Sequence, residues 1–268
     1  MNSAWDDSLW ALAALAIDPS GLKGIWLKTS HGPAKEEWLN WLFALRPDTR
    51  KLPSNVDTER LLGGLDLSMT LQLGRPVQQT GLLAQSHGKL LLCPMAERLE
   101  ESSASIVTQV LDTQRVSAHV ALESSESVQS VFGFIALDES TQEERGIALS
   151  LREQLGIWLD LNLCTHKDTA QDETLEMLER VERALQADPL SYKRALDQLE
   201  TQDQDLQDVC ELAHGFGIDS LRAPWFAIRL ATVFAALRGS SHLEASDLGR
   251  AARLVLTPRA IRFPAPSP

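Results

Sequence analysis

A short polar turn between residues 29 and 36 has the position and part of the composition of a phosphate-binding loop. Such a loop joins a buried strand to a helix. Its glycines turn backbone N–H groups inward, its lysine reaches the terminal phosphates, and a Ser or Thr hydroxyl holds magnesium. Against the pattern GxxxxGK[ST], the segment Thr29-Ser30-His31-Gly32-Pro33-Ala34-Lys35-Glu36 keeps the lysine as Lys35. The sequence therefore predicts Gly32 and Lys35 as residues of a degenerate nucleotide site.

Three positions of this pattern are altered. Thr29 stands at the first glycine, Ala34 at the second, and Glu36 at the Ser/Thr position. Ala34 adds a Cβ where the backbone should approach phosphate, and Pro33 removes one N–H donor. Glu36 introduces a negative charge near the expected phosphates and magnesium, which opposes nucleotide binding. We expect a loop that keeps the geometry of the motif and has lost its chemistry.

The second half of a hydrolysing site is also missing. An Asp-Glu pair at the end of a buried strand normally holds the magnesium shell and polarises the attacking water. Here the apolar strand at 89–93 ends in Cys93 and continues into Pro94, and Glu97 follows only after the proline. A thiol and a proline cannot replace two carboxylates. We therefore expect no catalytic residues and no efficient hydrolysis of nucleotide by this chain alone.

The elements that would position the loop are a short apolar strand at 24–28 and a helix with an apolar stripe at 36–45. A helix at 5–17, a helix at 104–111 and strands at 89–93, 116–122, 130–137 and 156–163 complete an α/β region, residues 1–165. Beyond it only helical patterns occur, at 174–186, 192–199, 206–216, 223–238 and 245–256. We assign residues 166–258 to this helical region and residues 259–268 to the start of a proline-rich linker.

Composition excludes several classes of protein. The 268 residues carry 25 Lys and Arg against 37 Asp and Glu, a net charge of −12, which argues against nucleic-acid binding. No apolar run is long enough to span a membrane, and acids replace the basic start of a secretory signal. Three cysteines without a CxxC pair predict no metal site and a reducing, cytoplasmic location.

The acidic residues are unevenly distributed along the chain. Between Asp168 and Glu211 there are 13 acids and 4 bases, a net charge of −9. This stretch is either a solvated helical face or a docking surface for a basic partner.

Longer motifs resemble one family. The segments 61–67, 74–77, 81–84 and 87–88 (LLGGLDL, GRPV, GLLA and HG) resemble the stretch between the two nucleotide motifs of the AAA+ subunits of magnesium chelatase. GIDSLRAP at 217–224 resembles their second sensor motif, and LVLTPRA at 254–260 the end of their helical lid. The resemblance covers residues 20–262. It implies an AAA+ module, with a P-loop-type parallel sheet core followed by an all-helical lid.

Site residues carry over by position in the motifs. Lys35 matches the phosphate-loop lysine, and Arg222 matches the sensor arginine that contacts the terminal phosphate in the family. The first sensor position falls on Asp138 or Glu139, where an acid would repel phosphate. The arginine-finger position becomes Gln154, with Arg152 two residues away. Lys35 as a plain surface lysine and Arg222 as an ordinary ion-pair arginine remain open.

The loss of the nucleotide motifs indicates the D-type branch of this family. The proline-rich tail indicates that the sequence resembles the N-terminal AAA+ half of such a subunit. The resemblance implies a non-catalytic oligomeric platform that assembles with the ATP-hydrolysing I subunit. Together they would drive the H subunit to insert Mg²⁺ into protoporphyrin IX. Mg-ATP would then belong to the partner, with weak ATP binding here left open. The alternatives are an active ATPase with an unconventional site and a MoxR-like AAA+ regulatory or chaperone protein.

Overall fold

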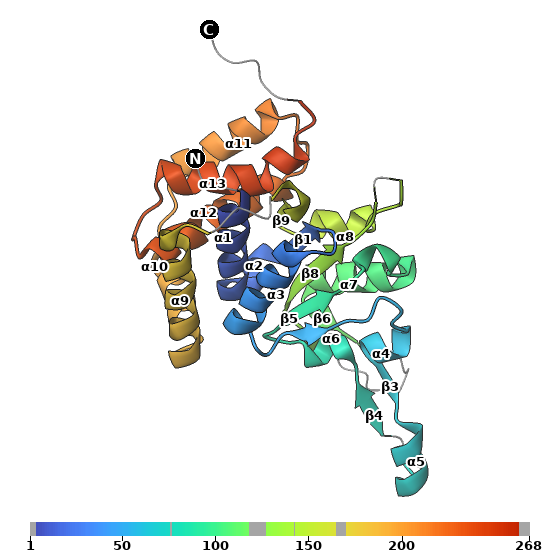
Figure 1. Cartoon of the computed structure of the whole chain (residues 1–268). Helices are drawn as coiled ribbons and strands as arrows, with labels where there is room; N and C mark the ends of the chain where they lie inside the picture. The colour runs from blue at the N-terminus through green and yellow to red at the C-terminus, as the bar shows by residue number, and fades with distance from the viewer. Residues whose placement is uncertain (1–3, 76, 118–126, 142, 165–169, 263–268) are drawn as a thin grey trace.

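A computed structural model of the chain describes residues 4–75, 77–117, 127–141, 143–164 and 170–262 (Figure 1). Its centre is a five-stranded parallel sheet in the order β2-β5-β8-β1-β9. The strands are β1 (Gly24–Lys28), β2 (Arg50–Lys51), β5 (Leu90–Cys93), β8 (Gly133–Asp138) and β9 (Ile157–Asp160). The predicted α/β fold with a parallel sheet and a helical C-terminal lid is confirmed.

One predicted strand ends earlier than expected, and another is described only at its start. Of the two described residues of the strand predicted at 116–122, Val116 pairs, in the two-residue strand β6 (Arg115–Val116) with β7 (Val128–Gln129). Residues 118–122 of that prediction lie outside the described residues. The strand predicted at 156–163 ends at Asp160, and the 3₁₀ turn η2 (Leu161–Leu163) follows because the Asp160 carboxylate accepts from the N–H of Asn162.

Both faces of the sheet are buried, as a parallel sheet requires. Side chains alternate along each strand. In β5, Leu90 and Leu92 belong to one hydrophobic cluster and Leu91 and Cys93 to the other. The second cluster is covered by α4 (Thr58–Leu62), α6 (Leu82–Gln85), η1 (Ala96–Arg98), α7 (Glu101–Thr113) and α8 (Leu149–Gln154).

A narrow arm projects from this side of the molecule (Figure 1). It consists of the antiparallel pair β3 (Gly63–Leu65) and β4 (Gln78–Thr80) with the short helix α5 (Leu67–Leu73) at its end. Gly63 has a φ of 92°, and a Cβ there would lie 2.4 Å from the carbonyl oxygen of Gln79. Only glycine fits such a close approach in this conformation.

The lid contains the helices predicted from the sequence. They are α9 (Asp172–Ala187), α10 (Ser191–Gln198), α11 (Asp203–Gly215), α12 (Arg222–Arg238) and α13 (Ala245–Val255), followed by the 3₁₀ turn η3 (Thr257–Arg259). Among the described lid residues, the only extended pairing is a single bridge between Glu200 and His242. Every helix in the described part of the chain is too short or too polar to cross a membrane.

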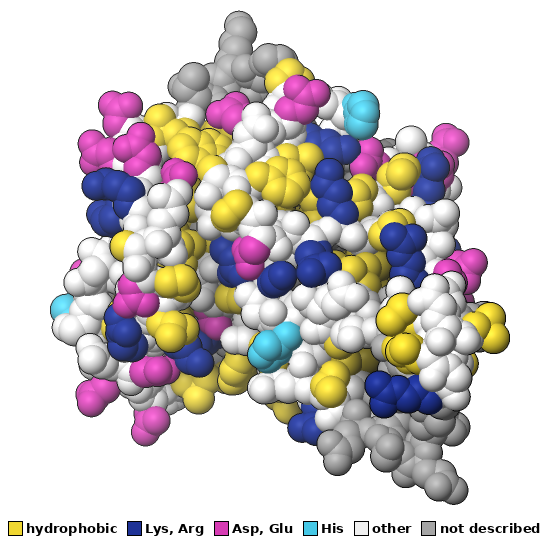
Figure 2. All heavy atoms as spheres, turned by 90° about the horizontal axis from the view of Figure 1, so that it is seen from below, with side chains coloured by type: hydrophobic (Ala, Val, Ile, Leu, Met, Phe, Trp, Pro, Cys, Tyr) yellow, Lys and Arg dark blue, Asp and Glu magenta, His cyan; other side chains and the backbone are white. Residues whose placement is uncertain are grey.

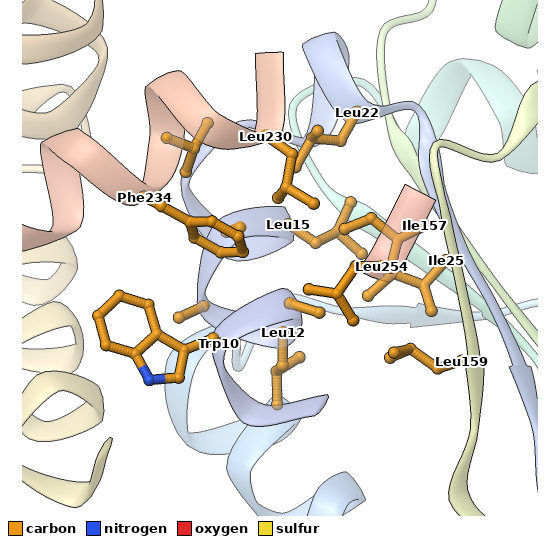
Figure 3. Packing of buried hydrophobic residues seen from close by; sticks show 14 of the residues in the cluster. Trp10, Leu12, Leu15, Leu22, Ile25, Ile157, Leu159, Leu230, Phe234 and Leu254 are labelled. Atoms are coloured by element: carbon orange, nitrogen blue, oxygen red, sulfur yellow. The ribbon is translucent and has the colours of Figure 1, made fainter. Parts of the chain in front are cut away.

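The N-terminal helix α1 (Ala4–Ile17) joins the sheet to the lid. Residues 5–16 are all buried, and this explains why apolar residues surround the helix instead of forming one stripe. Figure 3 shows its side chains between β1 and β9 on one side and α12 on the other, with Leu254 of α13 close to Ile25 and Ile157 of the strands. The sheet face covered by α1, α2 (Pro19–Leu22) and α3 (Pro33–Leu45) therefore shares one hydrophobic core with the lid.

Charged contacts support the same junction. Asp7 of α1 accepts two hydrogen bonds of 3.1 Å from the Arg253 guanidinium, and it lies 3.4 Å from Arg250. Arg259 stacks 3.9 Å from the ring centroid of Trp158 and donates to the carbonyls of Leu155, Gly156 and Val255. The lid is thus anchored through the second half of α13 and the turn that follows it.

We expect the substitution Leu12→Ala to lower the free energy of unfolding by about 2–5 kcal/mol, because it leaves a cavity between the sheet and the lid. Leu12 is fully buried, whereas Leu71 at the end of the arm is 84% exposed and provides the control Leu71→Ala. Urea unfolding of both variants measures the difference. Equal effects of the two substitutions would contradict this role of α1.

Candidate functional site

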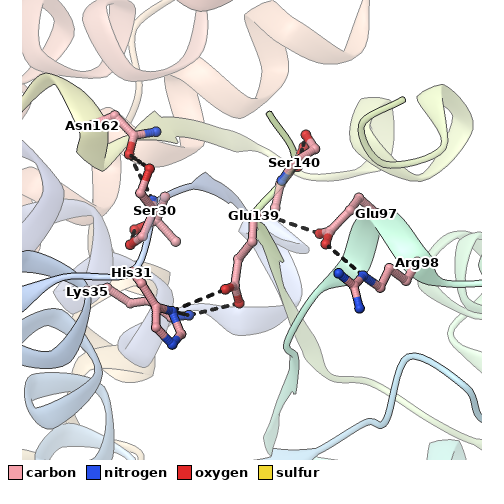
Figure 4. A network of polar contacts seen from close by, with 10 residues as sticks. Ser30, His31, Lys35, Glu97, Arg98, Glu139, Ser140 and Asn162 are labelled. Atoms are coloured by element: carbon pink, nitrogen blue, oxygen red, sulfur yellow. Dashed lines mark hydrogen bonds and ion pairs between the residues drawn. The ribbon is translucent and has the colours of Figure 1, made fainter. Parts of the chain in front are cut away.

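The degenerate loop lies at the carboxyl ends of β1 and β8, where ligands bind in sheets of this kind. Thr29 is buried and donates its N–H to the carbonyl of Asp138 at 3.0 Å. Ser30 donates from both N–H and Oγ to Oδ1 of Asn162, at 2.8 and 2.7 Å (Figure 4). The loop is therefore tied to both strands that flank β1, β8 directly and β9 through the turn that follows it.

Lys35 is held by an acid instead of facing an open site. Its Nζ lies 2.8 Å from Oε1 of Glu139, and the two side chains are only 10% and 19% exposed. Nδ1 of His31 lies 3.5 Å from Oε2 of the same carboxylate and 3.5 Å from the Lys35 Nζ (Figure 4). The lysine predicted to reach phosphate thus has its positive charge neutralised within the chain.

The altered motif positions have distinct surroundings. Gly32 is the N-cap of α3 with an extended φ of 162°, which any residue can adopt, and a Cβ there would meet no atom within 4 Å. Ala34 packs against the hydrophobic core, and Glu36 is exposed to solvent. The acid that contacts Lys35 is therefore Glu139 and not the adjacent Glu36.

The two candidates for the first sensor position differ in role. Asp138 is fully buried and accepts from Nε1 of Trp26 at 2.9 Å and from the N–H and hydroxyl of Ser140. These hydrogen bonds hold the end of β8 in place, and they direct the Asp138 carboxylate to Trp26 and Ser140. Glu139, the next residue, points to the loop.

The end of β5 offers no carboxylate of its own. Cys93 is buried, and burial, together with the nearby charge of Glu97, raises the pKa of its thiol to about 12. After Pro94 the chain turns into η1, and Glu97 Oε2 accepts from the N–H of Glu139 at 3.0 Å. Glu97 therefore supports the backbone of Glu139 and does not occupy the position of a catalytic acid.

Arg222 lies at the other end of the sheet. It is 3.4 Å from Asp112 of α7, which also lies 3.2 Å from Lys23, the residue before β1. Lys35, in contrast, follows β1. Burial acts to raise the pKa of Asp112, but the Lys23 hydrogen bond and the charges of Lys23 and Arg222 outweigh it and lower this pKa. The structure therefore does not bring Arg222 and Lys35 together.

The arginine-finger position is equally removed from the loop. Gln154 is buried and accepts from Lys23 Nζ at 3.4 Å. Arg152 stacks on the rings of Trp26 and Trp158, 5.0 and 4.6 Å from their centroids. Such cation–π contacts favour a guanidinium that stays in place. Neither residue extends from the surface as a finger would.

Two participants in the site were not predicted from the sequence. Asn162 accepts the hydrogen bonds of Ser30, and Glu97 accepts the hydrogen bond of the Glu139 N–H. A polar residue shortly after a buried strand is the available signal for both, since parallel strands end at the same edge of the sheet. Among the described residues, no group of three or more His, Cys, Asp or Glu is arranged to hold a metal ion.

Comparisons with known proteins agree with this architecture. A family model described as an AAA lid domain matches residues 206–268. The chain is 31% identical over 253 residues to the magnesium-chelatase 60 kDa subunit of Rhodobacter capsulatus, covering 94% of this chain and 40% of that protein. It is 27% identical over 270 residues to the 67 kDa subunit of Chlorobaculum tepidum, covering 96% and 43%. The chain thus spans about two-fifths of the length of these relatives.

The similarity extends to a second type of subunit. The magnesium-chelatase 38 kDa subunit of Cereibacter sphaeroides is 25% identical over 226 residues, covering 80% of this chain and 67% of that protein. Among solved structures, a presumed ATPase from Cytophaga hutchinsonii matches with a TM-score of 0.67 and 15% identity, covering 94% of this chain and 82% of that one. At that identity the likeness shows the fold alone.

We expect Cys93 to resist alkylation at pH 8.5, because with a pKa of about 12 its thiol stays protonated there, while an ordinary thiol is half ionised. Cys210 is exposed and serves as the internal control. Mass spectrometry of iodoacetamide-treated native protein measures both sites, and urea should make both reactive. Labelling of Cys93 in the native chain as fast as Cys210 would contradict the packing at the end of β5.

Proposed function

Because this chain is a homologue of the 60 and 67 kDa subunits of magnesium chelatase within the AAA+ family, we propose that it is a non-catalytic platform subunit of such a complex. It assembles with an ATP-hydrolysing AAA+ partner of the 38 kDa type. ATP turnover on that partner drives a porphyrin-binding H subunit to insert Mg²⁺ into protoporphyrin IX. This chain supplies shape and interfaces, and the energy comes from the partner's sites.

The ion pair between Lys35 and Glu139 is the observation that supports this proposal. Phosphate binding needs a free cation at the loop, and here the cation lies 2.8 Å from a carboxylate of the same chain. A nucleotide would also meet Cys93 and Pro94 where hydrolysis requires acids. An ATPase site needs the loop lysine, the second sensor arginine and catalytic carboxylates close together. Here Lys35 has neither Arg222 nor a catalytic carboxylate beside it.

An exposed apolar patch at the start of α12 suits a role in assembly. Leu221 is 90% exposed and Trp225 is 53% exposed. Four positions apart, they lie on the same face of the helix beside Arg222. Exposed aromatic and aliphatic side chains next to an arginine are typical of protein interfaces. We name Leu221, Arg222 and Trp225 the α12 patch.

The charge of the molecule is distributed in a way that also suits assembly. Figure 2 shows one face on which Lys and Arg side chains lie across the middle, with Asp and Glu mostly toward the edges. The net charge of −12 is thus not spread evenly. Separated regions of opposite sign favour oriented association with other subunits.

We expect titration calorimetry with Mg-ATP to give no binding heat for this chain alone, because the Glu139 carboxylate already forms an ion pair with Lys35. Mixed with a 38 kDa-type partner, the chain should form a stable complex on size-exclusion chromatography, and Lys35→Ala should not change the partner's ATPase rate. Micromolar binding to the isolated chain that Lys35→Ala abolishes would contradict the proposal and favour an active ATPase with an unconventional site.

The double substitution Leu221→Ser with Trp225→Ala should weaken the complex at least about tenfold, equivalent to about 1.4 kcal/mol. It removes apolar area from the α12 patch and also removes the edge contact of Trp225 with the ring of Phe226. Leu190→Ser, an exposed leucine between α9 and α10, is the matched control. Surface plasmon resonance measures the affinity. An unchanged affinity of the double variant would place the interface elsewhere.

A further inference from the structure

The loop at the start of α3 has the components of an anion site. Gly32 caps the helix without a side-chain hydrogen bond, and Pro33 has no N–H, so the N–H groups of Ala34 and Lys35 receive no side-chain acceptor from the cap. A helix N-terminus attracts negative charge. Lys35 adds a full positive charge in that first turn, with a side chain only 10% exposed. A cation this buried needs a counter-anion.

The chain itself supplies that anion. The Glu139 carboxylate contacts Lys35 through one oxygen, at 2.8 Å, and His31 through the other, at 3.5 Å. These contacts come from the loop and from the first turn of α3, the two elements that surround phosphate in an intact motif. The carboxylate therefore contacts the lysine on which a phosphate oxygen would depend, together with the neighbouring imidazole.

Glu139 is held in place by its neighbours. Its N–H donates to Glu97, whose carboxylate also lies 3.8 Å from Arg98. The preceding residue, Asp138, is held in place by the hydrogen bonds that it accepts from Trp26 and Ser140. An exposed surface pair would contribute little to stability, but this acid is largely buried and its backbone is fixed on both sides.

We propose that Glu139 is a built-in anion that replaces a bound phosphate at the degenerate loop and keeps the loop in one arrangement without nucleotide. The Glu139 carboxylate and a phosphate group then compete for Lys35. This inference deepens the proposed platform role and rests on its claim that the chain uses no nucleotide. It names the Glu139 carboxylate as the reason why the loop does not bind phosphate. Removing this carboxylate should restore phosphate binding.

The test is titration calorimetry of the whole chain carrying Glu139→Gln, with inorganic pyrophosphate and with Mg-ATP as separate probes. We expect Glu139→Gln to bind at least one probe tenfold or more tightly than the unsubstituted chain. Binding of pyrophosphate alone would define a phosphate site, and preference for Mg-ATP a nucleotide site. Glu143→Gln removes an equal charge from the exposed segment after β8 and should change nothing.

Further variants distinguish the possible outcomes. Adding Lys35→Ala to Glu139→Gln should abolish the gained binding. The inference is overturned if Glu139→Gln binds no more tightly than the unsubstituted chain, or if the gain survives without Lys35. If the unsubstituted chain binds Mg-ATP, the platform role is overturned instead. In that case, affinity at least tenfold higher in Glu139→Gln would still support competition between the Glu139 carboxylate and phosphate for Lys35.

A stability measurement covers the case in which Glu139→Gln does not fold well enough for titration. Lys35→Met, Glu139→Gln and the double variant form a double-mutant cycle in urea unfolding. We expect the double variant to lose less stability than the sum of the two single variants, because each single change leaves one buried charge unpaired. Strict additivity would show that the two groups are not coupled and would contradict the inference.

Discussion

The burial of a lysine at the carboxyl edge of a parallel sheet is the constraint around which the site is built. Its charge is tolerated there only with a fixed counter-charge, and Glu139 provides it from the end of the adjacent strand. Asp138, Ser140, Glu97 and Asn162 then hold the two chain segments that bring the pair together. In our proposal, this internal carboxylate takes the place of a phosphate at the loop.

Contacts within the chain hold the described fold together. Its stability comes from a sheet buried on both faces and from α1, whose side chains fill the space between the sheet and the lid (Figure 3). The Asp7–Arg253 pair and Arg259 on Trp158 connect the lid to the rest of the molecule.

Much of this arrangement could be predicted from the sequence, because local patterns encode it. The strand at 24–28, the following helix and the helical lid follow from apolar spacing and length. The partner of Lys35 could not be settled, since it depends on the pairing of Lys28 with Asp138, which places the residues after β1 and β8 side by side. The position of Arg222 depends on how the lid packs, which motif order does not reveal.

The most direct measurement of the central claim is a crystal structure of this chain grown with a non-hydrolysable ATP analogue and magnesium at millimolar concentration. The account predicts Lys35 and Glu139 in contact, as they are here, with no density for the analogue at the loop. Density for its phosphates on Lys35, with the Glu139 carboxylate displaced from the lysine, would contradict it.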